Sequence, residues 1–120
     1  MPVRQNHLII RQGTTLDEQI KFVKKPTGAQ TIATADAYPL TGTGVRGRLE
    51  DEDHTELIDL APTYHDAPNG IIRVQLTPAQ TAALPVTKAF CDFHEDFAGG
   101  VIKPLHRILF SVIHQSTDNP

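Results

Sequence analysis

The fold is decided at residues 76–85, which read Leu76-Thr77-Pro78-Ala79-Gln80-Thr81-Ala82-Ala83-Leu84-Pro85. An apolar run at residues 71–76 leads into this stretch. Thr77 is a good N-cap, and Pro78 suits the first helical position, where its missing N–H costs nothing. The alanines favour a helix, and Pro85 stops it. The pattern therefore predicts a strand, one short helix near residues 78–84, and a further strand from Thr87.

Gly and Pro residues divide the remaining chain into short apolar runs. Regularly spaced runs between turn signals are typical of a sandwich or barrel. The sequence therefore predicts an all-β fold, an immunoglobulin-like antiparallel β-sandwich of about seven strands with one short helix. The predicted strand regions are residues 7–11, 16–24, 44–50, 56–60, 71–76, 87–96 and 101–114.

Residues 16–24 leave two interpretations open. Thr15 and Glu18 fit a capping box, and Leu16, Ile20 and Val23 fall at helical spacing. As a strand the segment alternates imperfectly, because Glu18 falls on the apolar side. Its surroundings are all β, and we therefore expect a strand.

The composition limits the function classes. A chain of 120 residues is expected to form a single domain over residues 1–120, with flexible polar ends at about 1–6 and 115–120. A net charge of -3 argues against nucleic-acid binding. No run of eighteen apolar residues and no leader-like start are present, so we expect no membrane span and synthesis in a reducing cytoplasm. The single cysteine, Cys91, excludes an internal disulfide and is interpreted as a small core residue.

The last two strand regions form a predicted hairpin. Residues 96–100 are turn-like, with Gly99 and Gly100 suited to positive φ. Pro104 cannot donate to a ladder and marks a bulge or an edge. Residues expected in the core on the second arm are Ile102, Leu109, Val112 and Ile113. The residues expected to be largely buried overall are Ile9, Ile20, Phe22, Val45, Leu49, Leu57, Ile72, Val74, Leu76, Leu84, Phe93 and Leu109.

Several polar groups are candidates for a chemical site. His94 and His106, with Asp92 and Asp96 nearby, can be imagined around a metal, but no recognised ligand spacing appears. We interpret them as the solvated face of a hairpin. His65 and Asp66, in a predicted loop at residues 62–70, lack a nucleophile motif. The sequence therefore predicts no enzyme activity, no metal and no cofactor.

Charged residues follow the glycine-rich segment at 41–47. That segment lacks the phosphate-loop pattern, and the acidic run at 50–53 lacks the EF-hand pattern. Arg46 and Arg48 alternate along a strand and project from one face. They are expected to pair with Glu50 or Asp53, or with carboxylates of a partner protein.

Taken in order, six segments carry a resemblance to a known family. They are residues 10–15 (IRQGTT), 38–49 (YPLTGTGVRGRL), 69–85 (NGIIRVQLTPAQTAALP), and the final elements 91–94 (CDFH), 100–102 (GVI) and 107–113 (RILFSVI). Together they resemble small β-sandwich virion proteins of tailed phages and prophages, and are similar to the N-terminal domain of lactococcal phage upper baseplate proteins. Departures from the family pattern are Cys91 in place of an aromatic residue, Phe110 in place of a glycine, and the presence of Pro104 and His106.

The resemblance spans about residues 8–114 and implies a non-enzymatic structural role in a tail, baseplate or neck. It also implies other virion proteins as partners, a symmetric or multi-copy arrangement, and location in the virion after synthesis in the host cytoplasm. A decoration protein on the capsid is the alternative within this class. A carbohydrate-binding host-recognition module and a small metal-dependent hydrolase are alternatives from other classes. The expected contact loops are residues 26–40, 50–54 and 62–70, with contact candidates Arg46, Arg48, Asp51, Asp53, Tyr64, His65 and Tyr38.

Overall fold

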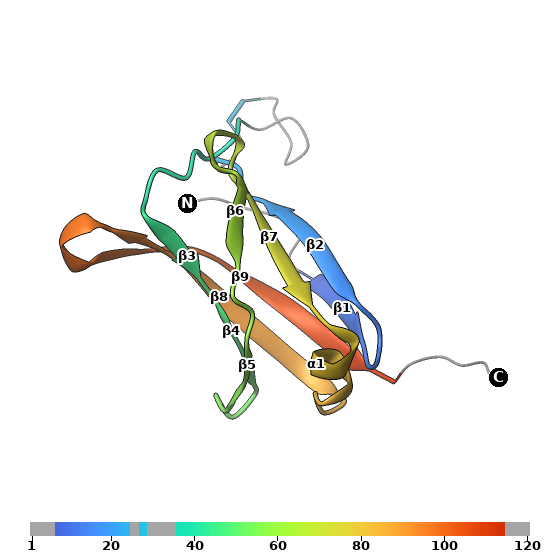
Figure 1. Cartoon of the computed structure of the whole chain (residues 1–120). Helices are drawn as coiled ribbons and strands as arrows, with labels where there is room; N and C mark the ends of the chain where they lie inside the picture. The colour runs from blue at the N-terminus through green and yellow to red at the C-terminus, as the bar shows by residue number, and fades with distance from the viewer. Residues whose placement is uncertain (1–6, 25–26, 29–35, 115–120) are drawn as a thin grey trace.

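The computed structural model describes residues 7–24, 27–28 and 36–114, which form two packed sheets (Figure 1). The larger sheet has the order β1 (His7–Arg11), β9 (Val101–Ile113), β8 (Thr87–Phe97), β4 (Arg48–Asp51) and β5 (Glu56–Asp59), with β3 (Gly44–Arg46) also paired to β8. The smaller sheet has the order β2 (Leu16–Lys21), β7 (Ile71–Leu76) and β6 (Thr63–Asp66). β1 and β9 are parallel, and the other paired strands are antiparallel. The predicted β-sandwich is confirmed.

The short helix forms where the sequence predicts it. Helix α1 covers Pro78–Ala82, so it ends two residues before Leu84. Thr77 Oγ1 accepts a hydrogen bond from the Gln80 backbone N–H, and Gln80 Oε1 accepts one from the Thr77 N–H. This reciprocal capping box satisfies two N–H groups that a helix start leaves unpaired. Two 3₁₀ turns, η1 (Ala67–Asn69) and η2 (Ala98–Gly100), lie in the connections.

The ambiguous segment at residues 16–24 is a strand over its first part. β2 pairs with β7 with Leu16 opposite Leu76 and Ile20 opposite Ile72, and all four side chains are buried. Cross-strand packing on the smaller sheet thus overrides the local helical pattern.

The core lies between the sheets and is mainly aliphatic. The rings of Phe22 and Phe93, one from each half of the sandwich, meet edge to face with centroids 6.1 Å apart. Aromatic pairs prefer this arrangement because a ring edge is positive and a ring face negative. Of the predicted core, the confirmed members are Ile20, Phe22, Leu49, Ile72, Val74, Leu76, Leu84, Phe93 and, from the final arm, Val112.

Part of the core prediction is wrong. Ile9, Leu109 and Ile102 are about half exposed, at 51%, 48% and 51%. Their neighbours in sequence, Ile10 and Ile108, are fully buried instead. In a strand, a phase error of one residue moves every side chain to the opposite face. Three other predicted core residues are only partly buried: Val45, Leu57 and Ile113.

The strand count and one loop also differ from expectation. The single predicted strand at residues 44–50 is divided at Gly47 into β3 and β4. The predicted loop at residues 62–70 contains β6, which pairs with β7 with Tyr64 opposite Ile72. Residues 63–66 form a strand instead of a loop because Thr63 and Tyr64 favour strands and the Tyr64 ring packs against the core.

Some expectations fall on residues that the structure does not describe. The ends at 1–6 and 115–120 lie outside the described residues, as does most of the predicted loop at 26–40. At the C-terminal end of that predicted loop, Ala37 forms an isolated antiparallel bridge with Val23.

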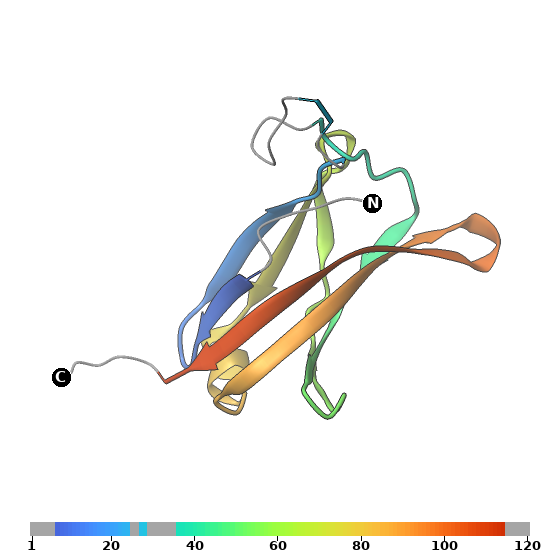
Figure 2. The ribbon, with the colours of Figure 1, turned by 180° about the vertical axis from the view of Figure 1, so that it is seen from behind.

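The final hairpin is the longest element. Asp92 pairs with Arg107 and His94 with Pro104, so Phe93 alone faces both Leu105 and His106. This is the bulge that Pro104 indicated. From both sides of the molecule, the turn of the β8–β9 hairpin is seen to extend beyond the other strands (Figures 1 and 2). Among the described helices none is long and apolar enough to cross a membrane.

Candidate interaction surface

Gly47 shapes the outer face of the larger sheet. β3 and β4 follow β8 in one register, with Arg46 opposite His94 and Glu50 opposite Phe90, and no pairing is formed between these two points. A Cβ on Gly47 would lie 2.6 Å from Cys91 Sγ and 2.8 Å from the Phe93 ring. Only a residue without a side chain allows the backbone to lie this close to the core.

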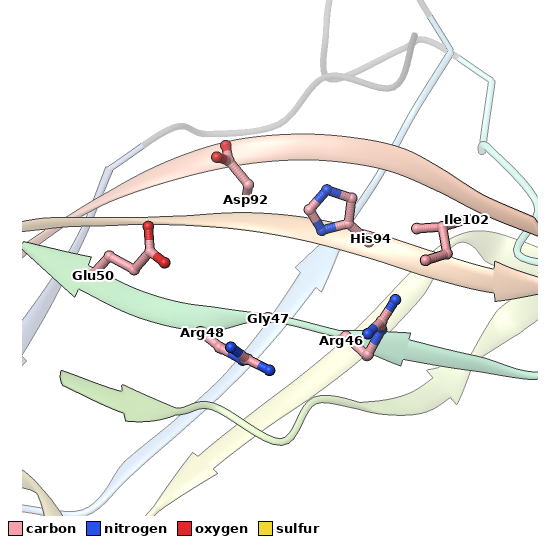
Figure 3. A pocket seen from close by; sticks show the side chains of 7 residues that line it. All are labelled: Arg46, Gly47, Arg48, Glu50, Asp92, His94 and Ile102. Carbon is pink, nitrogen blue, oxygen red and sulfur yellow. The ribbon is translucent and has the colours of Figure 1, made fainter. Parts of the chain in front are cut away.

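The interrupted pairing leaves an open cleft on this outer face. Its volume is about 390 Å³. Figure 3 shows side chains from β3, β4, β8 and β9 around it. The lining residues are Arg46, Gly47, Arg48, Glu50, Asp92, His94 and Ile102.

The cations of the cleft are paired within the molecule. Arg46 lies 2.9 Å from Asp96, and Arg48 lies 3.3 Å from Glu56, each measured between a guanidinium nitrogen and a carboxylate oxygen. The expected pairing with Glu50 or Asp53 is therefore wrong. Both arginine side chains remain more than half exposed, at 54% and 63%. Ion pairs this exposed contribute little to folding, and they can exchange partners at small cost.

Asp92 is held more firmly. Arg107 donates two hydrogen bonds to its carboxylate, at 2.7 and 3.0 Å. These bonds hold the pKa of Asp92 below its usual value. The Arg107 guanidinium also covers the Phe90 ring, 4.5 Å from its centroid, and His54 packs against the same ring edge to face. This part of the outer face is therefore an ordered aromatic and charged surface.

Glu95 is a buried carboxylate at the edge of the core, with two hydrogen-bond donors. Glu95 is 1% exposed, and its Oε2 accepts hydrogen bonds of 2.8 Å from the Tyr64 hydroxyl and from the Gly42 backbone N–H. Burial and this bond raise the pKa of Tyr64 to about 12. Because Tyr64 lies on β6 and Glu95 on β8, the bond joins the two sheets. Tyr64, a predicted partner contact, therefore has its hydroxyl bound within the molecule and its ring packed against the core.

The other contact candidates are spread over the molecule. Asp51 Oδ1 accepts hydrogen bonds from the backbone N–H groups of Asp53 and Thr55, so it fixes the β4–β5 turn. His65 is exposed on β6, and Tyr38 packs against the core. Of the seven candidates, the structure brings only Arg46 and Arg48 into one cleft.

The histidines weighed as metal ligands lie on the two arms of the hairpin. His94 lines the cleft, whereas His106 sits in the bulge. His106 Nδ1 is buried without a hydrogen-bond partner among the described atoms, and burial lowers the pKa of this side chain. Within residues 7–24, 27–28 and 36–114, no group of three or more His, Cys, Asp or Glu side chains is arranged to hold a metal ion.

Sequence reasoning did not single out Gly47, Glu95 or Arg107. The alternation of β8 carried a signal for Glu95, because Ala89, Cys91 and Phe93 face inward and residue 95 continues that series. The roles of Gly47 and Arg107 depend on the cross-strand register and had no local signal.

No known protein-family model and no curated protein matches the chain. Among solved structures, it is similar to CopC from Methylosinus trichosporium OB3b, with a TM-score of 0.52 and 9% sequence identity. The similarity covers 98% of this chain and 90% of that chain. At this identity the comparison defines the class of the protein, a β-sandwich, and nothing finer.

Proposed function

We propose that the protein is a non-enzymatic structural component of a tailed-phage particle, in the tail, baseplate or neck, where it binds neighbouring virion proteins. The observation that carries the proposal is the ordered resemblance of residues 8–114 to small β-sandwich virion proteins. The β-sandwich fold is compatible with that family, although many unrelated functions share such folds.

The outer cleft supplies a contact surface for this role. The side chains of Arg46 and Arg48 are more than half exposed, and each is paired with a carboxylate that is itself partly exposed. A carboxylate of a neighbouring protein can replace Asp96 or Glu56 with little loss, and Arg binds carboxylates in a planar, two-bond geometry. The proposed partner surface is therefore acidic.

The test has a genetic arm and a biochemical arm. We expect deletion of the gene from the phage or prophage that carries it to leave incomplete particles in electron micrographs. We also expect the protein in purified virions by mass spectrometry, in several copies per particle. Complete, infectious particles assembled without the gene, together with virions free of the protein, would refute the proposal.

A charge-reversal pair tests the cleft itself. Arg46→Glu with Arg48→Glu should lower incorporation into particles at least tenfold, because like charges then face the acidic partner. Lys21→Glu is the matched control, since Lys21 is an exposed cation on β2 of the other sheet. Equal incorporation of both variants would exclude the cleft as the contact surface.

A further inference from the structure

The turn between β6 and β7 contains the pair Asn69-Gly70. Among the three asparagines of the sequence, Asn69 is the one that glycine follows. The backbone nitrogen of the next residue can attack an asparagine side chain, and glycine hinders that attack least because it has no Cβ. Asn69 is exposed on η1, at the end of the smaller sheet (Figure 1). The reactive pair therefore lies where water, the other reactant, can reach it.

The backbone and side chain of Asn69 are held in a conformation that cannot react. The side-chain Nδ2 donates a hydrogen bond of 2.8 Å to Asp66 Oδ2. Attack by the Gly70 nitrogen closes a flat five-membered ring, which requires the Asn69 ψ angle to be about 120° in magnitude, whereas a 3₁₀ turn has ψ of roughly -20 to -30°. The ring can therefore close only after η1 has opened.

The attacking residue, Gly70, is held even more firmly. Its N–H donates to the Ala67 carbonyl at 3.0 Å, and its own carbonyl accepts a hydrogen bond of 2.8 Å from the Phe22 N–H. Its φ is 73°, and a Cβ added to it would lie 2.5 Å from the carbonyl oxygens of Phe22 and Tyr38. The Gly70 backbone thus fills a slot between two other segments, and its nitrogen is engaged.

We propose that Asn69 is a site of spontaneous deamidation that the closed turn protects and that reacts when the turn opens. In the open turn the Gly70 nitrogen forms a bond to Asn69 Cγ, the bond from Cγ to Nδ2 breaks, and ammonia leaves with the Gly70 amide proton. One water molecule then adds to either carbonyl of the ring and breaks the bond from that carbonyl to the Gly70 nitrogen. The product at position 69 is isoaspartate or aspartate, and no oxidant or reductant is consumed.

The rate of deamidation depends on how often the turn opens. Proteins open locally with free energies between about zero and that of global unfolding. Where closing is fast, a reaction confined to the open form proceeds at a rate set by the population of that form. The native contacts of Asn69 and Gly70 therefore slow deamidation by the factor by which they favour the closed turn, and an unfolded chain reacts without this protection.

Both products oppose closure of the turn. Isoaspartate lengthens the main chain before Gly70 by one carbon, so that Gly70 no longer matches the slot beside Phe22 and Tyr38. Aspartate replaces the hydrogen-bond donor with a second carboxylate next to Asp66, and like charges repel. A turn that opens long enough to react therefore does not close again as before.

The same turn anchors the segment that leads into β3. The Ala67 carbonyl also accepts a hydrogen bond from the Leu40 N–H at 2.8 Å, and the Tyr38 N–H donates to the Phe22 carbonyl at 3.0 Å. Deamidation is therefore expected to loosen residues 38–40 together with the turn. The inference goes beyond the proposed function, because it concerns a reaction of the chain itself and holds whether or not the protein belongs to a particle.

Rates of deamidation test the protection. The protein is incubated at one pH and temperature, folded and in guanidinium chloride, and peptide mass spectrometry follows conversion at position 69. We expect conversion at least about tenfold slower in the folded protein. Asp66→Ala should raise the folded rate about three- to tenfold, because the side-chain hydrogen bond is lost, and should leave the unfolded rate unchanged. Asp51→Ala is the matched control, since Asp51 also accepts hydrogen bonds within a turn, and it should keep the wild-type rate.

Stability of the products tests the second half of the inference. The deamidated protein, separated by ion exchange, should unfold at a lower urea concentration than the unmodified protein, and so should Asn69→Asp. The comparison of folded and unfolded wild type needs no variant, so it holds even if Asp66→Ala fails to fold. Equal rates in the folded and unfolded protein, no conversion in the unfolded protein, or a product as stable as the unmodified protein would overturn the inference. None of these results bears on the deletion experiment, and absence from virions would leave this chemistry unaffected.

Discussion

The middle of the β8–β9 hairpin, around Phe93, and its turn are made from the same pair of strands but differ in burial. Around Phe93, the inward side chains are fully buried beneath the smaller sheet. From Phe97 to Val101, the same alternation continues, but Val101 is half exposed and the Phe97 ring is covered only by Lys103, whose Nζ lies 4.8 Å from the ring centroid. Hydrogen-bonded pairing therefore does not decide burial in this molecule. Burial is decided by the smaller sheet, and Glu95 marks the boundary of the region that this sheet covers, because it is the last buried residue of β8 before the turn.

The largest expected effect is on the free energy of unfolding, and it contrasts the region around Phe93 with the turn. Phe93→Ala should lower the free energy of unfolding by roughly 3–5 kcal/mol, because a fully buried ring leaves a cavity. Val101→Ala should change it by less than about 0.5 kcal/mol, as at other surface positions. Urea denaturation at low protein concentration measures both. Equal losses for the two variants would mean that the turn of the hairpin is packed and that the boundary at Glu95 is wrong.

The next largest effect on the free energy of unfolding is expected at Glu95, the residue at the boundary. Glu95→Ala removes the acceptor of two hydrogen bonds and leaves the Tyr64 hydroxyl and the Gly42 N–H without it. Hydrogen bonds to charged groups contribute about 1.5–3 kcal/mol, and we expect a loss of about 2–3 kcal/mol in the free energy of unfolding. Asp96→Ala, one residue along, should cost less than about 1 kcal/mol, because its ion pair with Arg46 is exposed. Similar losses for the two variants would contradict the boundary role of Glu95.

Gly44, the first residue of β3, and Gly47, which lies between β3 and β4, extend the comparison to the outer face. Gly47→Ala should destabilise the fold by about 1–3 kcal/mol through overpacking against Cys91 and Phe93. Gly44→Ala should be tolerated, because nothing lies within 4 Å of its added Cβ. Thermal unfolding followed by circular dichroism separates the two outcomes. A tolerated Gly47→Ala would show that the cleft can form without this close approach.

Local sequence signals predicted the fold well where they agreed with each other. The start signals Thr77 and Pro78 predicted the helix, and Cys91 and Phe93 on β8 were correctly predicted in the core. The double glycine gave the turn. In each case one short window contains the whole physical cause.

The prediction failed where the cause is long-range. Residues 8–10 and 108–110 are each apolar throughout, so no alternation fixes which side faces the core. On β9 the bulge opposite Phe93 adds a residue, and counting from the turn then gives the wrong face. The sequence predicted no cleft, for the same reason. Arg46 and Arg48 could be placed on one face, but Asp92 and His94 join them only through the register with β8.

The smallest expected effect is a pH dependence at the boundary. The pKa of Tyr64 is raised from its usual value of 10.0 to about 12, by burial first and by the hydrogen bond to Glu95 second. The folded state therefore retains this proton more strongly than the unfolded chain does. The resulting stabilisation is fully present below pH 10 and is lost as the pH rises toward about 12. We expect the free energy of unfolding to fall across this window by more in the wild type than in Tyr64→Phe, whose ring keeps its packing but has no proton to lose. Tyr38→Phe is the matched control, since Tyr38 also packs against the core and its replacement leaves the bond between Tyr64 and Glu95 in place. Indistinguishable slopes for the wild type and Tyr64→Phe would show that the bond between Tyr64 and Glu95 does not join the sheets in solution.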